Sequence, residues 1–229
     1  NKNITCDVGQ IMFAQTVTAS ADTMSQYRNH HFAHPKKWIC ADIECDAGCG
    51  IVPFEYQDKN FVHSLQWAIG LELFLLIKDP WRIYLTTDHP NGAAFTAYPK
   101  LIKLLMDRSF RNNEFAKINK QAQKSSVLSN LKREYNLYDI AILTRAGPAK
   151  VLGLKNTGHL GVGANANITI YSEIEDKEKM FENPYMVIKD GEIVVKNGKI
   201  QKVLNGKFYT AQVDYDKNIE KEISIYFEK

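Results

Sequence analysis

The stretch Trp81-Arg82-Ile83-Tyr84-Leu85, followed directly by Thr86-Thr87-Asp88-His89-Pro90-Asn91-Gly92, decides the fold. The mostly apolar first part predicts a short buried strand, and the Pro/Asn/Gly run predicts a turn after it. In a β/α barrel, the chemistry lies on the loops at the carboxyl ends of the strands. Asp88 is therefore the first candidate for a metal ligand or a general base. The plain alternative is that Asp88 holds the turn or caps the next helix.

Three further side chains are candidates for binding a substrate beside Asp88. Asn91 can present an amide, and His89 adjoins the carboxylate, although neighbours in an extended segment point in opposite directions. Glu44 follows another predicted strand, 38–43, so its loop can line the same cleft. Two carboxylates there suit general acid–base chemistry. The ordinary alternatives are a turn for Asn91, a loop histidine for His89 and a solvated acid for Glu44.

Length and composition set broad bounds on the class of protein. The chain has 229 residues and a net charge of +3, with 45% hydrophobic and 24% charged residues. These values are ordinary for a globular protein and do not indicate a nucleic-acid surface. The most apolar run, 67–77, contains Glu72, so we expect a buried helix and no membrane insertion. No secretory signal is evident, and we expect a cytoplasmic protein that begins in mid-strand, as a piece of a longer chain.

Two groups of residues could in principle bind a metal. Cys40, Cys45 and Cys49 have spacings that fit neither a paired zinc site nor a disulfide framework, and we interpret them as separate thiols. The His30-His31-x2-His34 group has no partner ligand at a recognised spacing, so a surface loop is expected. Asp88 alone does not make a tight zinc site. Structural roles, with both tryptophans in the core, are expected for His63, His159, Trp67 and Trp81.

Alternating strands and helices over residues 1–154 predict a barrel-like α/β architecture with parallel strands. We expect the segment 16–20 to be a polar loop and the segment 111–126 to be solvated surface. Asn136 is expected to cap a helix that Gly147-Pro148 interrupts and Gly153 closes. The other predicted elements are strands at 4–8, 38–43 and 81–87, a helix at 61–77 and a helix that starts at Tyr98-Pro99.

After residue 154 the pattern changes, and residues 155–229 predict a small β-sandwich-like layer that forms a second domain. Asp190-Gly191 and Asn197-Gly198 predict tight hairpin turns between short strands. The tail, 208–227, alternates in the manner of edge strands.

Several segments together resemble the amidohydrolase superfamily, and within it the A subunits of the formylmethanofuran dehydrogenases of methanogenic archaea. The Trp-Ala-Ile-Gly helix and the Thr-Thr-Asp-x-Pro-Asn-Gly turn carry most of the specificity. The resemblance covers nearly the whole chain. The segments that carry it are 4–9 (ITCDVG), 67–77 (WAIGLELFLLI), 85–92 (LTTDHPNG), 144–150 (TRAGPAK) and 158–163 (GHLGVG).

The resemblance implies that the chain is the C-terminal portion of an amidohydrolase (β/α)8 barrel with a small β domain. It implies zinc-dependent interconversion of N-formylmethanofuran with formate and methanofuran. Asp88 matches the aspartate that ligates a dinuclear zinc centre and shuttles a proton. The remaining zinc ligands have no counterpart in this chain and are expected upstream.

The same resemblance implies a multi-subunit complex. Partner subunits would carry a molybdenum or tungsten pterin and iron–sulfur clusters, and would couple the reaction to CO2 reduction in methanogenesis. Two alternatives remain open: a cyclic-amide amidohydrolase similar to dihydroorotases or hydantoinases, and a non-catalytic scaffold of a redox complex. Because a partial barrel leaves strand edges unpaired, we expect no activity from the 229 residues alone.

Overall fold

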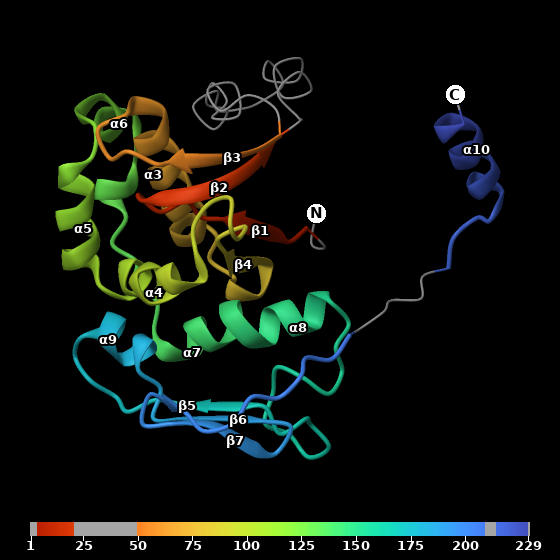
Figure 1. The fold of residues 1–229 in the computed structure, drawn as a ribbon. Helices are drawn as coiled ribbons and strands as arrows, with labels where there is room; N and C mark the ends of the chain where they lie inside the picture. The colour runs from red at the N-terminus through yellow and green to blue at the C-terminus, as the bar shows by residue number, and fades with distance from the viewer. Residues whose placement is uncertain (1–3, 21–49, 209–213, 229) are drawn as a thin grey trace.

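The computed structural model describes residues 4–20, 50–208 and 214–228 of the chain. At its centre are two parallel strands, β1 (Cys6–Gly9) and β4 (Ile83–Thr86), with Val8 opposite Leu85. Figure 1 shows them between a group of helices and the more distal C-terminal sheet. The parallel pairing confirms the prediction from the order of the elements. The predicted barrel is not closed by the described residues, and the predicted strand at 38–43 lies outside them.

Helix α3 (Phe61–Leu76) supplies much of the core, as its apolar sequence predicts. It begins where the Asn60 side chain accepts a hydrogen bond from the His63 N–H, at 3.2 Å. The chain then forms the 3-10 turn η3 (Pro80–Arg82), so β4 is shorter than the predicted strand. Trp67 is 1% exposed, which confirms its predicted place in the core.

Trp81 is 36% exposed, so its predicted place in the core was wrong. The physical reason is that Trp81 lies in the turn before the strand, where its ring reaches the surface. The Lys150 ammonium lies 5.1 Å from the centre of that ring.

A β-hairpin replaces the polar loop predicted at 16–20. Strand β2 (Gln15–Ser20) pairs in antiparallel fashion with β3 (Gly50–Glu55), with Thr16 opposite Phe54. Threonine and valine have branched side chains that favour strands, and they alternate here between buried Thr16 and exposed Val17. The prediction gave too much weight to the polarity of the segment and too little to its period of two.

The segment 111–126 is also not simply solvated surface. It folds into α5 (Arg108–Lys117) and α6 (Lys120–Ser125), which follow α4 (Tyr98–Met106) and its 3-10 lead-in, η4 (Phe95–Ala97). The 3-10 turn η5 (Leu128–Asn130) comes next. One face of these helices packs into the core through side chains three or four residues apart. The buried residues on that face are Arg111, Phe115, Ile118 and Ala122.

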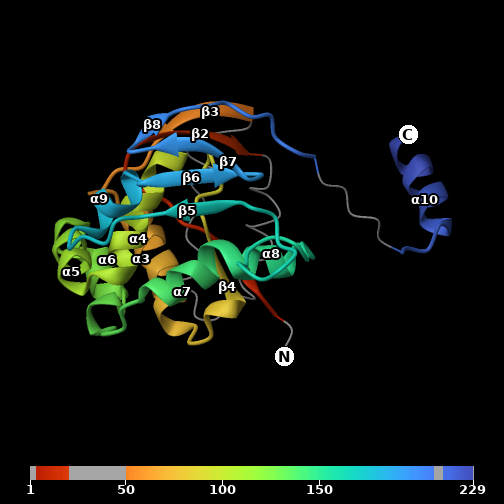
Figure 2. The same cartoon turned by 90° about the horizontal axis from the view of Figure 1, so that it is seen from below.

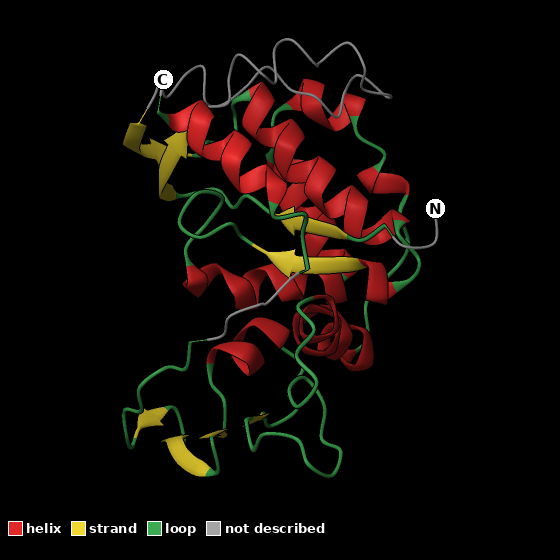
Figure 3. Ribbon diagram, turned by 90° about the vertical axis from the view of Figure 1, so that its right-hand side faces the viewer, coloured by secondary structure: helices red, strands yellow, loops and turns green. Residues whose placement is uncertain are grey.

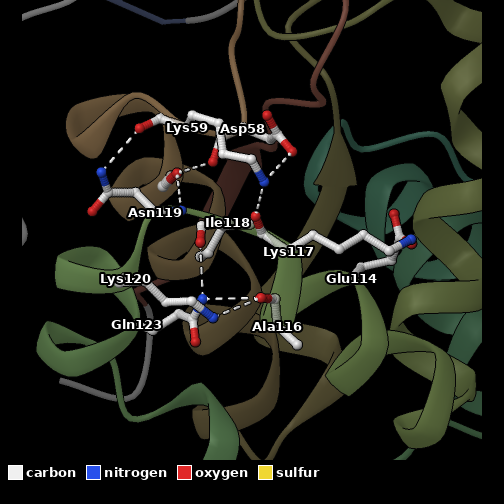
Figure 4. Close-up of polar contacts among 10 residues, drawn as sticks. Asp58, Lys59, Glu114, Ala116, Lys117, Ile118, Asn119, Lys120 and Gln123 are labelled. Carbon is white, nitrogen blue, oxygen red and sulfur yellow. Dashed lines mark hydrogen bonds and ion pairs between the residues drawn. The ribbon is translucent and has the colours of Figure 1, made fainter.

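Polar contacts hold the α5–α6 junction against the start of α3 (Figure 4). Asn119 accepts from the N–H groups of Gln121 and Ala122, and its amide donates to the Lys59 carbonyl at 2.9 Å. The Gln123 amide donates to the Ile118 carbonyl at 2.8 Å. The turn between the two helices is therefore fixed by side chains that a polar-surface interpretation leaves without a role.

Helix α7 (Leu137–Ala141) starts at the predicted cap, since Asn136 and Asp139 form a capping box. The predicted interruption at Gly147-Pro148 was wrong. A π-helical segment, η6 (Ile142–Ala146), leads directly into α8 (Gly147–Val151), where proline occupies the first turn and needs no N–H partner. A β-carbon on Gly147 would lie 2.7 Å from Tyr84 Cε1, so this glycine lets the helix approach β4. Gly153, with φ of +69°, closes the helix as predicted.

The C-terminal region forms one antiparallel sheet with the order β5-β6-β7-β8, seen from below in Figure 2. The predicted Asp-Gly and Asn-Gly turns are confirmed, since both residues of each pair have positive φ. A single sheet, and not a sandwich, is present in the described part of this region. The division of the chain at residue 154 stays a prediction. The strands are β5 (Ile168–Ile170), β6 (Met186–Lys189), β7 (Glu192–Lys196) and β8 (Lys199–Ile200).

Two helices complete the C-terminal region, shown in red with the others in Figure 3. α9 (Lys177–Glu182) packs on α4, and α10 (Asn218–Phe227) ends the described chain. The edge strand predicted for the tail was therefore wrong at α10, where apolar residues recur every three or four positions and favour a helix. No helix among the described residues combines the length and the apolar character needed to cross a membrane.

An ion pair fastens α9 to α4 and predicts a pH dependence. Lys103 Nζ lies 2.8 Å from Asp176 Oδ1, and this hydrogen bond lowers the pKa of Asp176 below its ordinary 3.8 and raises the pKa of Lys103. A carboxylate with a lowered pKa stabilises the fold above its ordinary pKa and stops doing so as the pH falls through the folded value. Asp176→Asn should therefore reduce the loss of thermal stability between pH 6 and pH 3. Denaturation curves at both pH values measure this.

The matched control is Glu173→Gln, which removes a carboxylate that is 73% exposed and lies 3.5 Å from Lys177 within the same segment. This control should leave the pH dependence of the wild type unchanged. Equal pH dependence in Asp176→Asn and wild type would contradict the assignment. Asparagine still caps α9, so the comparison isolates the charge.

Candidate functional site

Asp88 follows β4 directly and opens a tight turn. Its φ is +46°, a left-handed conformation in which aspartate is among the more frequent non-glycine residues. The Asn91 N–H donates to the Asp88 carbonyl at 2.6 Å, and the Gly92 N–H donates to the Thr87 carbonyl at 2.9 Å. The turn leaves the side chain of Asp88 exposed at the carboxyl end of the strand, as predicted.

Backbone bonds join this turn to the end of the neighbouring strand β1. The Gln10 N–H donates to the Thr86 carbonyl at 3.0 Å, and the Met12 N–H donates to the Gly92 carbonyl at 3.0 Å. A β-carbon on Gly92 would lie 2.5 Å from the Thr87 carbonyl oxygen, so only glycine allows this close approach. The carboxyl ends of both parallel strands therefore meet at one edge, with Asp88 between them.

The structure brings together some of the predicted site residues. The Asn91 amide donates to Asp88 Oδ2 at 2.9 Å, so Asn91 holds the carboxylate. The His89 ring stacks on Phe95 with the ring centres 3.9 Å apart, which makes an aromatic platform beside the turn. Glu44 lies outside the described residues, as do the groups at 30–34 and 40–49.

One carboxylate near this edge was missed by the sequence reasoning. In β1, Val8 and Gln10 are buried while Asp7 and Gly9 are exposed, so Asp7 and Gly9 share the other face of the strand. Asp7 Oδ1 accepts a hydrogen bond from Thr86 Oγ1 at 2.5 Å. A β-carbon on Gly9 would lie 3.1 Å from Asp88 Cβ. The alternation of the Asp-Val-Gly-Gln segment was the signal for this face.

The described residues do not by themselves fit a metal centre. Within 4–20, 50–208 and 214–228, no group of three or more histidine, cysteine, aspartate or glutamate residues could hold a metal ion. A tight zinc site needs three or four such ligands. Asp88 is a single candidate ligand, paired with an amide and adjoined by a histidine that is stacked on Phe95.

The other two described histidines have structural roles, which confirms both predictions. His63 is buried, and its Nδ1 accepts from the Gln57 N–H at 3.0 Å. His159 lies in the turn before the C-terminal sheet, where Nδ1 accepts from the Gly161 N–H at 3.1 Å.

Comparison with known proteins gives long matches at high identity. The chain is 45% identical over 226 residues to the A component of the formyltransferase/hydrolase complex Fhc of Methylorubrum extorquens, which covers 99% of this chain and 41% of that protein. It is 42% identical over 231 residues to Protein FwdA of Methanocaldococcus jannaschii, covering 97% of this chain and 40% of FwdA. The chain thus spans about two fifths of the length of these relatives.

A solved structure matches in the same way. It is the crystal structure of the formyltransferase/hydrolase complex FhcABCD from Methylorubrum extorquens in complex with methylofuran, and it matches with a TM-score of 0.80. The sequence identity is 46%, and the match covers 99% of this chain and 42% of that one. These relatives confirm the resemblance to A-type subunits. The sequence model of the amidohydrolase family matches residues 2–195, and the chain therefore belongs to the amidohydrolase family.

Proposed function

We propose that this chain is part of an A-type subunit that hydrolyses, or forms in reverse, the formyl amide of a furan-containing carrier such as methanofuran or methylofuran. The observation that carries the proposal is the match to FhcABCD over 99% of this chain at 46% identity. The position of Asp88 at the carboxyl end of β4 supports it, because amide hydrolysis needs a carboxylate near the reacting carbon.

In the proposed reaction, Asp88 moves a proton. A water oxygen attacks the formyl carbon while the Asp88 carboxylate accepts a proton from that water. The carbon–nitrogen bond then breaks, and the proton passes to the leaving nitrogen, giving formate and the free amine of the carrier. The Asn91 amide keeps the carboxylate oriented, since it occupies Oδ2 at 2.9 Å. His89 contributes its stacked ring to the wall of the site.

Zinc and the redox partners remain proposals of the resemblance. The described residues offer one candidate metal ligand, Asp88, so no step above passes through a metal. The proposed partners are the other subunits of a formyltransferase/hydrolase or formylmethanofuran dehydrogenase complex, the latter with molybdenum or tungsten pterin and iron–sulfur subunits. The names of the relatives support a multi-subunit assembly.

The native complex tests the proposal through its substrates. We expect release of formate from the formylated carrier and no ring opening of dihydroorotate or hydantoin. Turnover of the cyclic amides alone would instead support the cyclic-amide alternative. Retention of every activity after removal of the Asp88 carboxylate would support the scaffold alternative.

The contact between Asn91 and Asp88 gives a separate prediction about positioning. Asn91→Ala should lower kcat for formyl hydrolysis about 10- to 100-fold and leave KM within a factor of two, because a misplaced catalytic group slows the reaction step and not binding. Asn91→Ser, whose hydroxyl can still donate, should recover part of the loss. A raised KM at unchanged kcat would instead assign Asn91 to substrate binding. Steady-state kinetics of the purified complexes measure both constants.

A further inference from the structure

A hollow of about 490 Å³ lies between the β2–β3 hairpin and the turn that carries Asp88. Its volume is within the range of about 300–1,000 Å³ that is typical of small-molecule sites. One wall is formed by the exposed face of the hairpin, and the facing wall comes from the segment after Asp88. The residues that give the two walls their chemical character are Gln15, Val17, Pro53, Glu55, Pro90 and Ala94.

The strand register arranges the hairpin wall by chemical character. Val17 is paired with Pro53, and Gln15 is paired with Glu55, so an apolar pair and a polar pair lie next to each other on one face. The Val17 N–H donates to the Pro90 carbonyl at 3.4 Å, which places the apolar pair against the turn. The hollow is therefore apolar where it meets the turn, and the polar pair offers oxygen acceptors further along the hairpin.

The hollow is continuous with the candidate site. Pro90 lines it and is two residues from Asp88, and Ala94 lines it and is next to Phe95, on which His89 stacks. A molecule with its formyl amide at Asp88 can therefore extend past the aromatic platform into the hollow. The unreactive body of a large substrate is what such an extension binds, because contacts remote from the reacting atoms supply binding energy and specificity.

We propose that this hollow is the subsite for the unreactive body of the formylated carrier. The body that fits is an elongated one, apolar next to the formyl amide and carrying N–H donors further out, which would bond to Gln15 and Glu55. This inference rests on the proposed function, since that function supplies the formylated carrier. It adds that the β2–β3 hairpin selects the carrier while Asp88 acts on its formyl group.

The test uses the whole complex and two variants from opposite walls of the hollow. Val17→Asp places a charge on the apolar wall, at a side chain that is already 40% exposed, and Ala94→Phe fills the space from the facing wall. Each should weaken binding of the unformylated carrier, measured by calorimetry, and raise KM for the formylated carrier by roughly 10- to 100-fold. The kcat at saturation should stay within a factor of two of wild type.

The matched control is Val203→Asp, the same substitution at a valine that is 83% exposed in the C-terminal region, and it should leave both constants unchanged. Unchanged carrier affinity in Val17→Asp and Ala94→Phe, with the complex intact, would overturn the inference. So would loss of assembly on size-exclusion chromatography, which would make the hollow a contact between subunits. Failure of the proposed function is a different result: the wild-type complex would bind the carrier in the hollow without releasing formate.

Discussion

Asp88→Asn is expected to lower formyl hydrolysis by the complex about 10²- to 10⁴-fold, the usual effect of losing a general acid–base group. The substitution keeps the size of the side chain and its ability to occupy the turn. What it removes is the carboxylate at the carboxyl end of β4. Assembly of the complex and affinity for the unformylated carrier should remain close to wild type. Single-turnover release of formate, alongside size-exclusion chromatography, measures these quantities.

Asp79→Asn is the control for this experiment because Asp79 lies at the opposite end of the same strand region. Its side chain accepts from the Trp81 N–H at 3.0 Å, a role that an asparagine oxygen can also fill. Activity should therefore stay within a factor of two. If Asp88→Asn retains full activity while the wild type is active, the catalytic role of Asp88 is wrong, and the scaffold interpretation of this segment gains support.

The largest expected loss of stability comes from Arg111→Met. Arg111 is 0% exposed, and burial lowers the pKa of its guanidinium. It donates to the carbonyls of Leu104 at 2.8 Å and Arg133 at 2.9 Å, so it ties α5 to the end of α4 and to the segment before α7. Methionine keeps much of the volume but leaves these buried carbonyls without their donor. The expected cost is about 3 kcal/mol in the free energy of unfolding.

Arg145→Met provides the comparison, since Arg145 lies on the exposed side of the helical segment η6. Its expected effect is within about 0.5 kcal/mol, as for most surface substitutions. Urea unfolding of the full-length polypeptide, followed by tryptophan fluorescence, measures both variants. A loss below about 1 kcal/mol for Arg111→Met would mean that water replaces the guanidinium as the donor.

The elements that could be predicted from the sequence are those whose local signals agree with their tertiary surroundings. The apolar run of α3, the turn after β4 and the Asp190-Gly191 hairpin each carry a strong short-range pattern. The Asn136 cap is equally local. Such signals need no knowledge of the rest of the chain, because backbone sterics and hydrogen bonds within four residues determine them.

The helices α5 and α6 show why other elements were missed. Their composition is polar, and the mean polarity hid the positions that pack, although Arg111, Phe115, Ile118 and Ala122 follow helical spacing. A buried arginine also defies the rule that charges lie outside, and its carbonyl partners are up to 22 residues away along the chain. Partners at that distance are fixed by tertiary packing, which a local pattern does not encode.

The candidate site divides in the same way. The pairing of Asp88 with Asn91 follows from three residues of separation in a turn, whereas the stacking of His89 on Phe95 depends on the path of the chain after the turn. Asp7 was missed because it is 79 residues from Thr86 in the sequence. Parallel strands bring such residues together, and the register of the strands was not predictable from either segment alone.

The bond from the Met12 N–H to the Gly92 carbonyl has a consequence for how a substrate would be read and acted on. The short link 10–14 leaves β1, bonds to the Asp88 turn and continues directly into the hairpin that walls the hollow. Recognition and reaction would thus share one rigid frame, with no hinge between them. Lengthening that link by a residue would displace the bound carrier relative to the carboxylate, so affinity could survive while turnover collapsed.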